Sequence, residues 1–223
     1  MRTRPLILGL AAVAACGLAL NLCAQTTQRK YKIVYVPKVR ATAKARSDGA
    51  IDGVREGRPV IRAVTPEDTA VVSSDAPTLY WFIDRATRFP CSAVVTTAGD
   101  EVLFERKYDG VERPGLIAVD VGKGGKKLEP GKDYRFAVFL VVDPNEPASD
   151  VESSGALRYE PMSPEAQKQV AAAAGPAARA AAYAGNGYFV EAVAALAEDG
   201  SAESKALLDD LFDQVKLNVT TQK

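Results

Sequence analysis

One stretch, residues 128–142, constrains the fold more than any other part of the chain. It reads Leu-Glu-Pro-Gly-Lys-Asp-Tyr-Arg-Phe-Ala-Val-Phe-Leu-Val-Val. Pro130 and Gly131 predict a turn, because proline fixes φ and glycine accepts positive φ. Residues 133–142 then follow with few polar side chains, and their β-branched and aromatic content favours a strand over a helix. Since both faces of this strand are mostly apolar, we expect a central strand that is covered on both sides for much of its length.

Tyr134 lies at the start of this strand, behind the Leu-x-Pro-Gly turn. This arrangement resembles the tyrosine corner of immunoglobulin-like sandwiches, in which the phenol bonds a nearby backbone group. A second apolar strand carries Trp81, the sole tryptophan, on the same face as Leu79 and Ile83, so Trp81 is expected in the core. The residues with a predicted structural role are Trp81, Pro130, Gly131, Tyr134 and Phe136.

Eight short segments have the composition of strands, and turn residues such as Pro66 and Pro77 separate them. Gly99 and Asp100 predict a hairpin turn between two of these segments. Short, regularly spaced strands of this kind are typical of a sandwich or barrel rather than of alternating β and α units. We therefore predict an immunoglobulin-like antiparallel β-sandwich over residues 59–162. The expected strands are residues 59–64, 69–73, 78–84, 91–98, 101–108, 115–121, 133–142 and 155–159.

From Ser163 onward the apolar period is that of helices. Ser163 suits an N-cap and Pro164 suits the first helical position. Gly175 and Pro176 should break or kink the first helix, because proline has no backbone N–H to donate to the helical hydrogen bonds. We expect about three helices, which together cap the sandwich and place the chain in the α+β class. The predicted segments are a helical cap over residues 163–219 and a tail over residues 220–223.

Residues 1–24 have the pattern of an export signal, with Arg2 and Arg4 before a long apolar run. Three fates of this segment stay open. The signal is cleaved near Ala24, or Cys16 receives a lipid after a lipobox-like Val-Ala-Ala-Cys sequence, or the segment remains as an uncleaved anchor. In each case the protein is exported, to the periplasm or beyond, and it meets the membrane only through this segment.

Residues 25–58 form a basic arm. Between residues 29 and 62 the chain has ten lysines and arginines against three acidic residues. Residues 41–57 show no sustained apolar period, so we expect a flexible linker. The arm is either a solvated tether or a segment that attracts anionic polymers or lipid head groups of an envelope.

The composition excludes several kinds of chemistry. The chain contains no histidine, which removes the commonest general base and zinc ligand and makes a Ser-His-Asp triad impossible. The 28 basic and 28 acidic residues cancel, so nothing suggests nucleic-acid binding. Cys91 is the one cysteine beyond the leader, so a disulfide framework is excluded and this thiol is expected to be a small buried hydrophobe. We therefore expect no catalytic residues and no cofactor.

One loop after the central strand gathers oxygen ligands, and its start resembles a calcium loop. It lacks the glycine and the final glutamate that such loops have at the sixth and twelfth positions, so a plain polar loop is the main interpretation. The residues that would bind calcium are Asp143, Asn145, Asp150 and Glu152.

The helical region also offers a docking surface, because a Tyr-Ala-Gly-x-Gly-Tyr sequence resembles the junction of two helices in a tetratricopeptide unit. We find one such hairpin and no repeat. The alternative is a helical cap that packs on the sandwich. The candidate docking residues are Tyr183, Tyr188, Phe189, Leu211 and Phe212.

The order of these motifs along the chain resembles an uncharacterised bacterial family, domain-of-unknown-function family 928. The resemblance implies export and the architecture above, and it supplies no catalytic residues. The chain has Phe136 and the Tyr188-Phe189 pair where more tryptophan is expected, which keeps the aromatic bulk. The segments that carry the resemblance are residues 77–82, 113–117, 128–136, 155–159 and 183–192.

These observations predict an exported, non-enzymatic module that binds or scaffolds an envelope protein partner. One alternative is a hydrolase that uses carboxylates, near residues 143–152 or at Asp84. The other is an accessory protein that docks a membrane sensory or secretion partner through its C-terminal helices.

Overall fold

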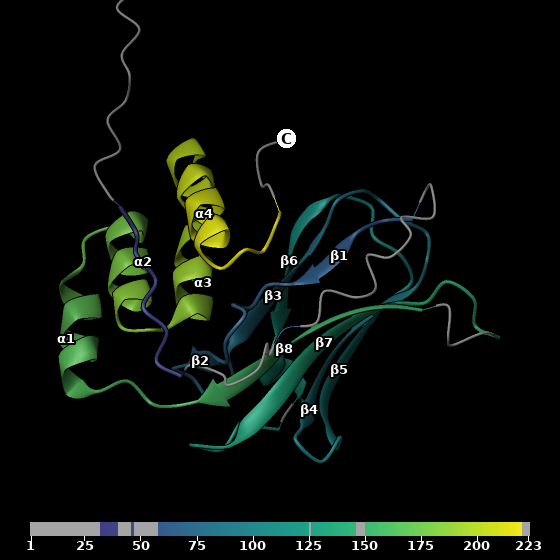
Figure 1. Ribbon diagram of the computed structural model, residues 1–223, viewed down its shortest axis with the longest axis horizontal. Coiled ribbons are helices and arrows are strands. Elements are labelled where there is room, and N and C mark those ends of the chain that lie inside the picture. Colours follow the sequence, from purple (N-terminus) through teal and green to yellow (C-terminus); the bar gives the residue numbers. More distant parts are fainter. Residues whose placement is uncertain (1–31, 40–45, 47–57, 125, 146–149, 220–223) are drawn as a thin grey trace, which may run out of the picture.

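A computed structural model describes residues 32–39, 46, 58–124, 126–145 and 150–219. Two β-sheets come first and four helices follow, so the chain has the α+β architecture (Figure 1). The helices gather at one end of the sheets. Each predicted strand segment contains a strand, although the last strand begins at Val151, four residues before its predicted start. The predicted leader, residues 1–24, and the predicted tail, residues 220–223, lie outside the described residues.

The larger sheet has five strands in the order β2-β8-β7-β4-β5. Residues 133–142 were predicted as a central strand, and β7 lies between β8 and β4. Gly99 and Asp100 form the predicted hairpin turn between β4 and β5, with Asp100 at a φ of 61°. The strands are β2 (Ala70–Val72), β8 (Val151–Tyr159), β7 (Asp133–Leu140), β4 (Cys91–Thr97) and β5 (Val102–Tyr108).

The prediction that β7 is covered on both faces for much of its length is confirmed for the inner face and only in part for the outer face. Tyr134, Phe136 and Val138 are buried on the inner face. On the outer face Ala137 is buried, but Arg135 is exposed and pairs with Glu152 of the neighbouring strand. A strand of a two-sheet protein with helices at one end needs only one fully buried face, which explains the difference.

The pairing of β2 with β8 is parallel, whereas a wholly antiparallel arrangement was predicted. Ala70 lies opposite Leu157, and Val72 lies opposite Tyr159. Parallel neighbours require a long crossover, and here residues 73–150 lie between the two strands in the chain. The short length of β2 gives no periodic signal that could have set its direction.

The smaller sheet has three antiparallel strands in the order β1-β3-β6. β1 lies against β7 and β8 of the larger sheet. Between the sheets Trp81 is fully buried, as predicted, and its ring meets Tyr108 of β5 edge-on at 5.6 Å between centroids. The strands are β1 (Ile61–Ala63), β3 (Thr78–Ile83) and β6 (Gly115–Asp120), and a short 3-10 helix, η1 (Val121–Gly124), follows β6.

The turn before β7 is held by the hydrogen bond expected of a tyrosine corner. The backbone N–H of Glu129 donates to the phenol oxygen of Tyr134 at 2.7 Å. Gly131 has a φ of 76°, a conformation that favours glycine. The N–H of Gly131 donates to the carbonyl of Tyr159 at 2.8 Å and so ties the turn to the end of β8.

The C-terminal region has four helices instead of about three. Gly175 has a φ of 86° and Pro176 begins a new helix, so the predicted break is complete and divides one expected helix into two. Ser163 caps the first helix and Ser201 caps the last, each through its hydroxyl group. The helices are α1 (Pro164–Ala172), α2 (Pro176–Gly185), α3 (Phe189–Asp199) and α4 (Ala202–Gln214).

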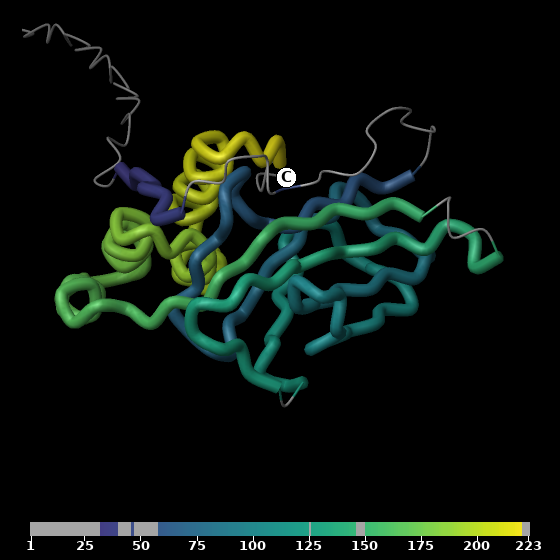
Figure 2. The backbone as a smooth tube through the Cα atoms, turned by 60° about the horizontal axis from the view of Figure 1, so that its bottom comes forward, coloured from purple at the N-terminus to yellow at the C-terminus, as the bar shows by residue number. Residues whose placement is uncertain are grey.

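Part of the predicted flexible arm lies against the helices, as the purple segment in Figure 2 shows. The N–H of Val36 donates to the carbonyl of Ala184 at 3.1 Å, and the ring of Tyr35 packs edge-on against Phe189. Arg46 is buried and donates to the carbonyls of Thr65 and of two residues just after α4. Residues 32–39 and 46 of the basic arm therefore make tertiary contacts that no local pattern reveals.

Candidate functional site

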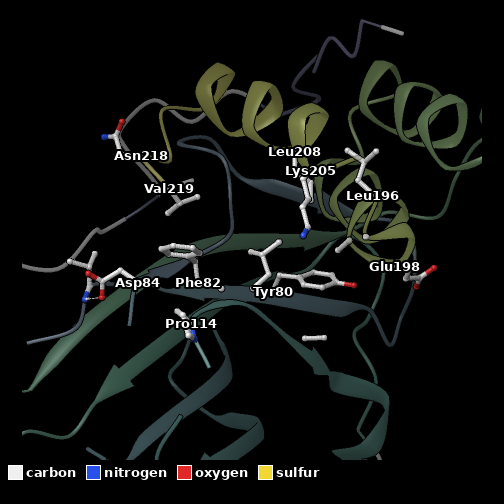
Figure 3. Close-up of a pocket in the computed structure, with 16 residues that line it drawn as sticks. Tyr80, Phe82, Asp84, Pro114, Leu196, Glu198, Lys205, Leu208, Asn218 and Val219 are labelled. Carbon is white, nitrogen blue, oxygen red and sulfur yellow. Dashed lines mark hydrogen bonds between the residues drawn. The ribbon is translucent and has the colours of Figure 1, made fainter. Parts of the chain in front are cut away.

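An open groove of about 780 Å³ lies between the outer face of the small sheet and the C-terminal helices (Figure 3). β3 supplies the middle of its floor, α3 and α4 supply its walls, and residues after α4 close one end. The groove is lined by Val60, Tyr80, Phe82, Asp84, Pro114, Gly115, Leu116, Ala118, Leu196, Ala197, Glu198, Gly200, Lys205, Leu208, Asn218 and Val219.

The floor follows from the two-residue period of β3. Leu79, Trp81 and Ile83 point toward the larger sheet, so Tyr80 and Phe82 point the opposite way, into the groove. Both faces of β3 are apolar, and each therefore needs a cover. The larger sheet covers one face. On the other face, toward α3 and α4, Tyr80 is 6% exposed and Phe82 is 8% exposed.

The walls are apolar. Leu196 and Ala197 come from the last turns of α3, and Leu208 comes from the middle of α4. Val219 closes the end near the chain terminus. A surface of this composition binds apolar groups, because each contact removes apolar area from water.

Three charged side chains line the groove. Asp84 forms an ion pair with Arg85 at 2.9 Å and accepts the backbone N–H of Val60 at 2.8 Å. Figure 3 shows Asp84 and Glu198 at opposite ends of the groove, with Tyr80 and Phe82 between them. The two carboxylates therefore do not converge as a catalytic pair would.

The phenol of Tyr80 lies toward Glu198 in Figure 3. Burial raises the pKa of Tyr80 above its ordinary value, and the charge of Glu198 raises it further. Tyr80 is therefore a neutral hydrogen-bonding group at physiological pH. The amino group of Lys205 points toward the floor above Tyr80 and Phe82 and is the cation of the groove lining.

A second polar cluster lies where β2 meets α3. Both the backbone N–H and the hydroxyl of Ser73 donate to one carboxylate oxygen of Glu191, the hydroxyl at 2.8 Å. The other oxygen, Oε2, is buried, and no described group donates to it. Burial raises the pKa of Glu191, while the bonds from Ser73 and the charge of Lys38 lower it by less. This cluster joins the sheet to the helices, and neither Ser73 nor Glu191 lines the groove over β3.

The structure does not bring the predicted calcium ligands together. Asp150 accepts the N–H of Val142 at 3.2 Å, Asp143 accepts that of Asn145 at 2.8 Å, and Glu152 pairs with Arg135. Among the described residues no group of three potential ligands could hold a metal ion. Residues 146–149 of this loop lie outside the described part of the chain.

The proposed docking residues are mostly inaccessible. Tyr188, Phe189, Leu211 and Phe212 have no exposed surface, so the prediction that they form a docking surface is wrong. Only Tyr183 is half-buried. The amphipathic stripe is real, but it packs against the other helices and the sheets, as the alternative of a helical cap requires.

Cys91 begins β4 with its side chain in the core. Burial raises its thiol pKa to about 11, so the thiol stays protonated and unreactive at neutral pH. This agrees with the interpretation of Cys91 as a small buried hydrophobe.

The sequence analysis missed the groove, although part of its signal was present. Tyr80 and Phe82 alternate with three core residues in a strand that is apolar on both faces. That pattern could have predicted that the outer face of β3 is covered, but not that a groove remains between β3 and the helices that cover it. Lys205 and Leu208 belong to a helix that lies more than 110 residues after β3, and no local pattern links them to that strand.

Comparison with known proteins identifies the family. The model of the Domain of Unknown Function family DUF928 matches residues 41–223. The chain belongs to this family. The match covers both sheets and all four helices, so the whole described fold from Arg46 onward is the DUF928 unit. No curated protein matches the chain. Within the described residues, no helix is long and apolar enough to cross a membrane.

Proposed function

We propose that this DUF928 protein is an exported, non-enzymatic binding module of the bacterial cell envelope, and that it holds its ligand in the groove over β3. The observation that carries the proposal is the groove itself, with an aromatic floor, apolar walls and an opening to solvent. Pockets of a few hundred to about 1,000 Å³ with this kind of lining are where proteins bind ligands.

The positions of the ionisable groups support binding rather than catalysis. Asp84 is neutralised by Arg85, and Glu198 lies at the far end of the groove. Lys205 and the neutral phenol of Tyr80 can orient a polar part of a ligand. Turnover of a screened ester, glycoside or peptide by the purified protein would overturn the non-enzymatic part of the proposal.

We infer in addition that the two sheets form a divergent immunoglobulin-like sandwich. The bond between Tyr134 and Glu129, and the tryptophan between the sheets, support this assignment. The parallel pairing of β2 with β8 is the departure that makes the sandwich divergent.

Export rests on the sequence of residues 1–24. The intact mass of the mature protein tests it, because cleavage near Ala24, a lipid on Cys16 and an uncleaved anchor each give a different mass. Recovery of the full-length chain in the cytoplasmic fraction would contradict export.

Titration with 1-anilinonaphthalene-8-sulfonate tests the groove. This anionic apolar probe should saturate a single site on the folded protein. Ala197→Phe fills the groove from α3 and should weaken probe binding at least tenfold. Ala171→Phe is the matched control, because Ala171 is exposed on α1 and does not line the groove. Equal binding by both variants, or no binding by the unchanged protein, would refute the groove as the ligand site.

A further inference from the structure

β6 forms one edge of the small sheet, with β3 on its other side. The N–H of Val121 donates to the carbonyl of Pro77, and Val121 directly follows Asp120 in the register with β3. Antiparallel strands alternate between residues that bond their neighbour and residues that point away. Ile117 and Val119 therefore bond β3, and the N–H and C=O groups of Leu116 and Ala118 point away from the sheet.

These outward groups lack a partner in the part of the chain that the structure describes. Leu116 is half-buried and Ala118 is exposed, so a ligand can reach them. An edge strand with free N–H and C=O groups is a template for another strand.

The β5 edge of the larger sheet is protected by charged side chains, and β6 is not. β5 carries the exposed charged side chains of Glu105, Arg106 and Lys107. Charges of this kind prevent a second strand from pairing. β6 has no charged residue from Gly115 to Val119. The difference marks β6 as an edge that is open to pairing.

The same residues border the groove. The side chains of Leu116 and Ala118 line it beside Tyr80 and Phe82 of the neighbouring strand. A strand added along β6 would therefore continue the floor, and every second side chain of that strand would face the groove.

We propose that the ligand of the groove is an extended peptide segment of a partner protein, which pairs with β6 as the fourth strand of the small sheet. Two donors and two acceptors on Leu116 and Ala118 bond its main chain. Apolar side chains at alternate positions enter the groove, and proline is excluded from the two bonding positions, because it lacks the N–H. This inference rests on the proposed function and names the ligand class for the same site.

The position of Ala118 allows a clean test. Ala118→Pro removes an N–H that bonds nothing in the described fold, and proline is tolerated at outward positions of an edge strand. Ala118→Val is the matched control, because it enlarges the side chain and keeps the N–H. Both variants should unfold at the temperature of the unchanged protein.

The probe is a phage-displayed library of random decapeptides, panned against the purified full-length protein. Enriched peptides are synthesised with a fluorophore and titrated by anisotropy. We expect apolar residues at every second position and equal binding to the unchanged protein and to Ala171→Phe, which lies outside the groove. Binding to Ala118→Pro should be at least tenfold weaker than binding to Ala118→Val. Hydrogen exchange of the Leu116 and Ala118 amides should slow on binding.

Other results would overturn the inference. In one such result, enriched peptides bind Ala118→Pro as well as the unchanged protein and leave both amides unprotected, yet lose affinity for Ala197→Phe. That result would keep the groove as the binding site and refute pairing of the peptide with β6. If the panning enriches no peptide and the protein forms dimers that Ala118→Pro dissociates, the strand that pairs with β6 comes from a second copy of this chain. No enrichment and no binding of the anilinonaphthalene probe would refute the groove as well.

Discussion

Two glycine-to-alanine changes should have opposite effects on stability, and the structure gives the reason. Gly155 lies in β8, opposite Phe136 of β7, and faces the small sheet. A Cβ at this position would overlap the hydroxyl of Thr65 and lie 2.8 Å from the Cβ of Thr65. Gly185 is the last residue of α2, and a Cβ there would meet no atom within 4 Å.

The clash at Gly155 has no easy relief. Thr65 is fully buried, its N–H donates to the carbonyl of Ala63, and its own carbonyl accepts from Arg46. Inserting atoms into a packed core lowers the free energy of unfolding by about 1–3 kcal/mol. Because Thr65 cannot move away, we expect Gly155→Ala to lose about 3 kcal/mol. For a chain of this size that is a fall of roughly 6–12 °C in Tm. Gly185→Ala should raise stability by about 0.5 kcal/mol, since alanine has the higher helix propensity.

Urea unfolding measures both changes. The fluorescence of Trp81 reports the transition, because this sole tryptophan is fully buried between the sheets. Repeating Gly155→Ala in a Thr65→Gly background removes the atoms that clash, and the cost should fall below about 1 kcal/mol. A loss under about 0.5 kcal/mol in the natural background, or the same loss in both backgrounds, would refute the packing argument.

Three further results are expected. Tyr134→Phe removes the bond from Glu129 N–H and should cost about 1 kcal/mol in urea unfolding, whereas an unchanged midpoint would mean that the turn does not need this bond. Because the pKa of Glu191 is raised, the folded natural protein keeps this proton at pH values where the unfolded chain has lost it, so the stability of the natural protein falls as pH rises from the ordinary glutamate pKa to the raised one. Glu191→Gln has no such proton and should become more stable relative to the natural protein over this pH range. An equal change in the stability of both proteins across the range would contradict this. Cys91, with a pKa of about 11, should resist iodoacetamide at pH 8 until urea unfolds the chain, and rapid labelling of the folded protein would show an accessible thiolate instead.

The strands could be predicted because their signals are local. The alternation around Trp81, the turn at Pro130 and Gly131, and the hairpin at Gly99 and Asp100 each involve neighbouring residues. The caps at Ser163 and Ser201 are equally local. Secondary structure and much of the core follow from such patterns, because each one specifies which side chains must leave water.

The docking prediction failed because local patterns show which face of a helix is buried and do not show what buries it. The apolar stripe that includes Leu211 and Phe212 shows that one face of α4 is buried. The stripe does not show whether this protein or a partner covers that face. Here the cover is the protein's own sheet and helices. The contacts of Tyr35 and Val36 in the basic arm could not be predicted either, because their partners lie about 150 positions away in the chain.

The sequence by itself determined that this chain has an α+β architecture, which residues turn, which strands and helices form, and that histidine chemistry is absent. Only the tertiary structure decided that β2 runs parallel to β8, that Glu191 is buried against Ser73, and that α3 and α4 leave a groove beside an open strand edge. Periodicity fixes the faces that each element must bury, because burial is a property of single side chains. The space left between two elements depends on how they are placed relative to each other, and distant parts of the chain set that placement together.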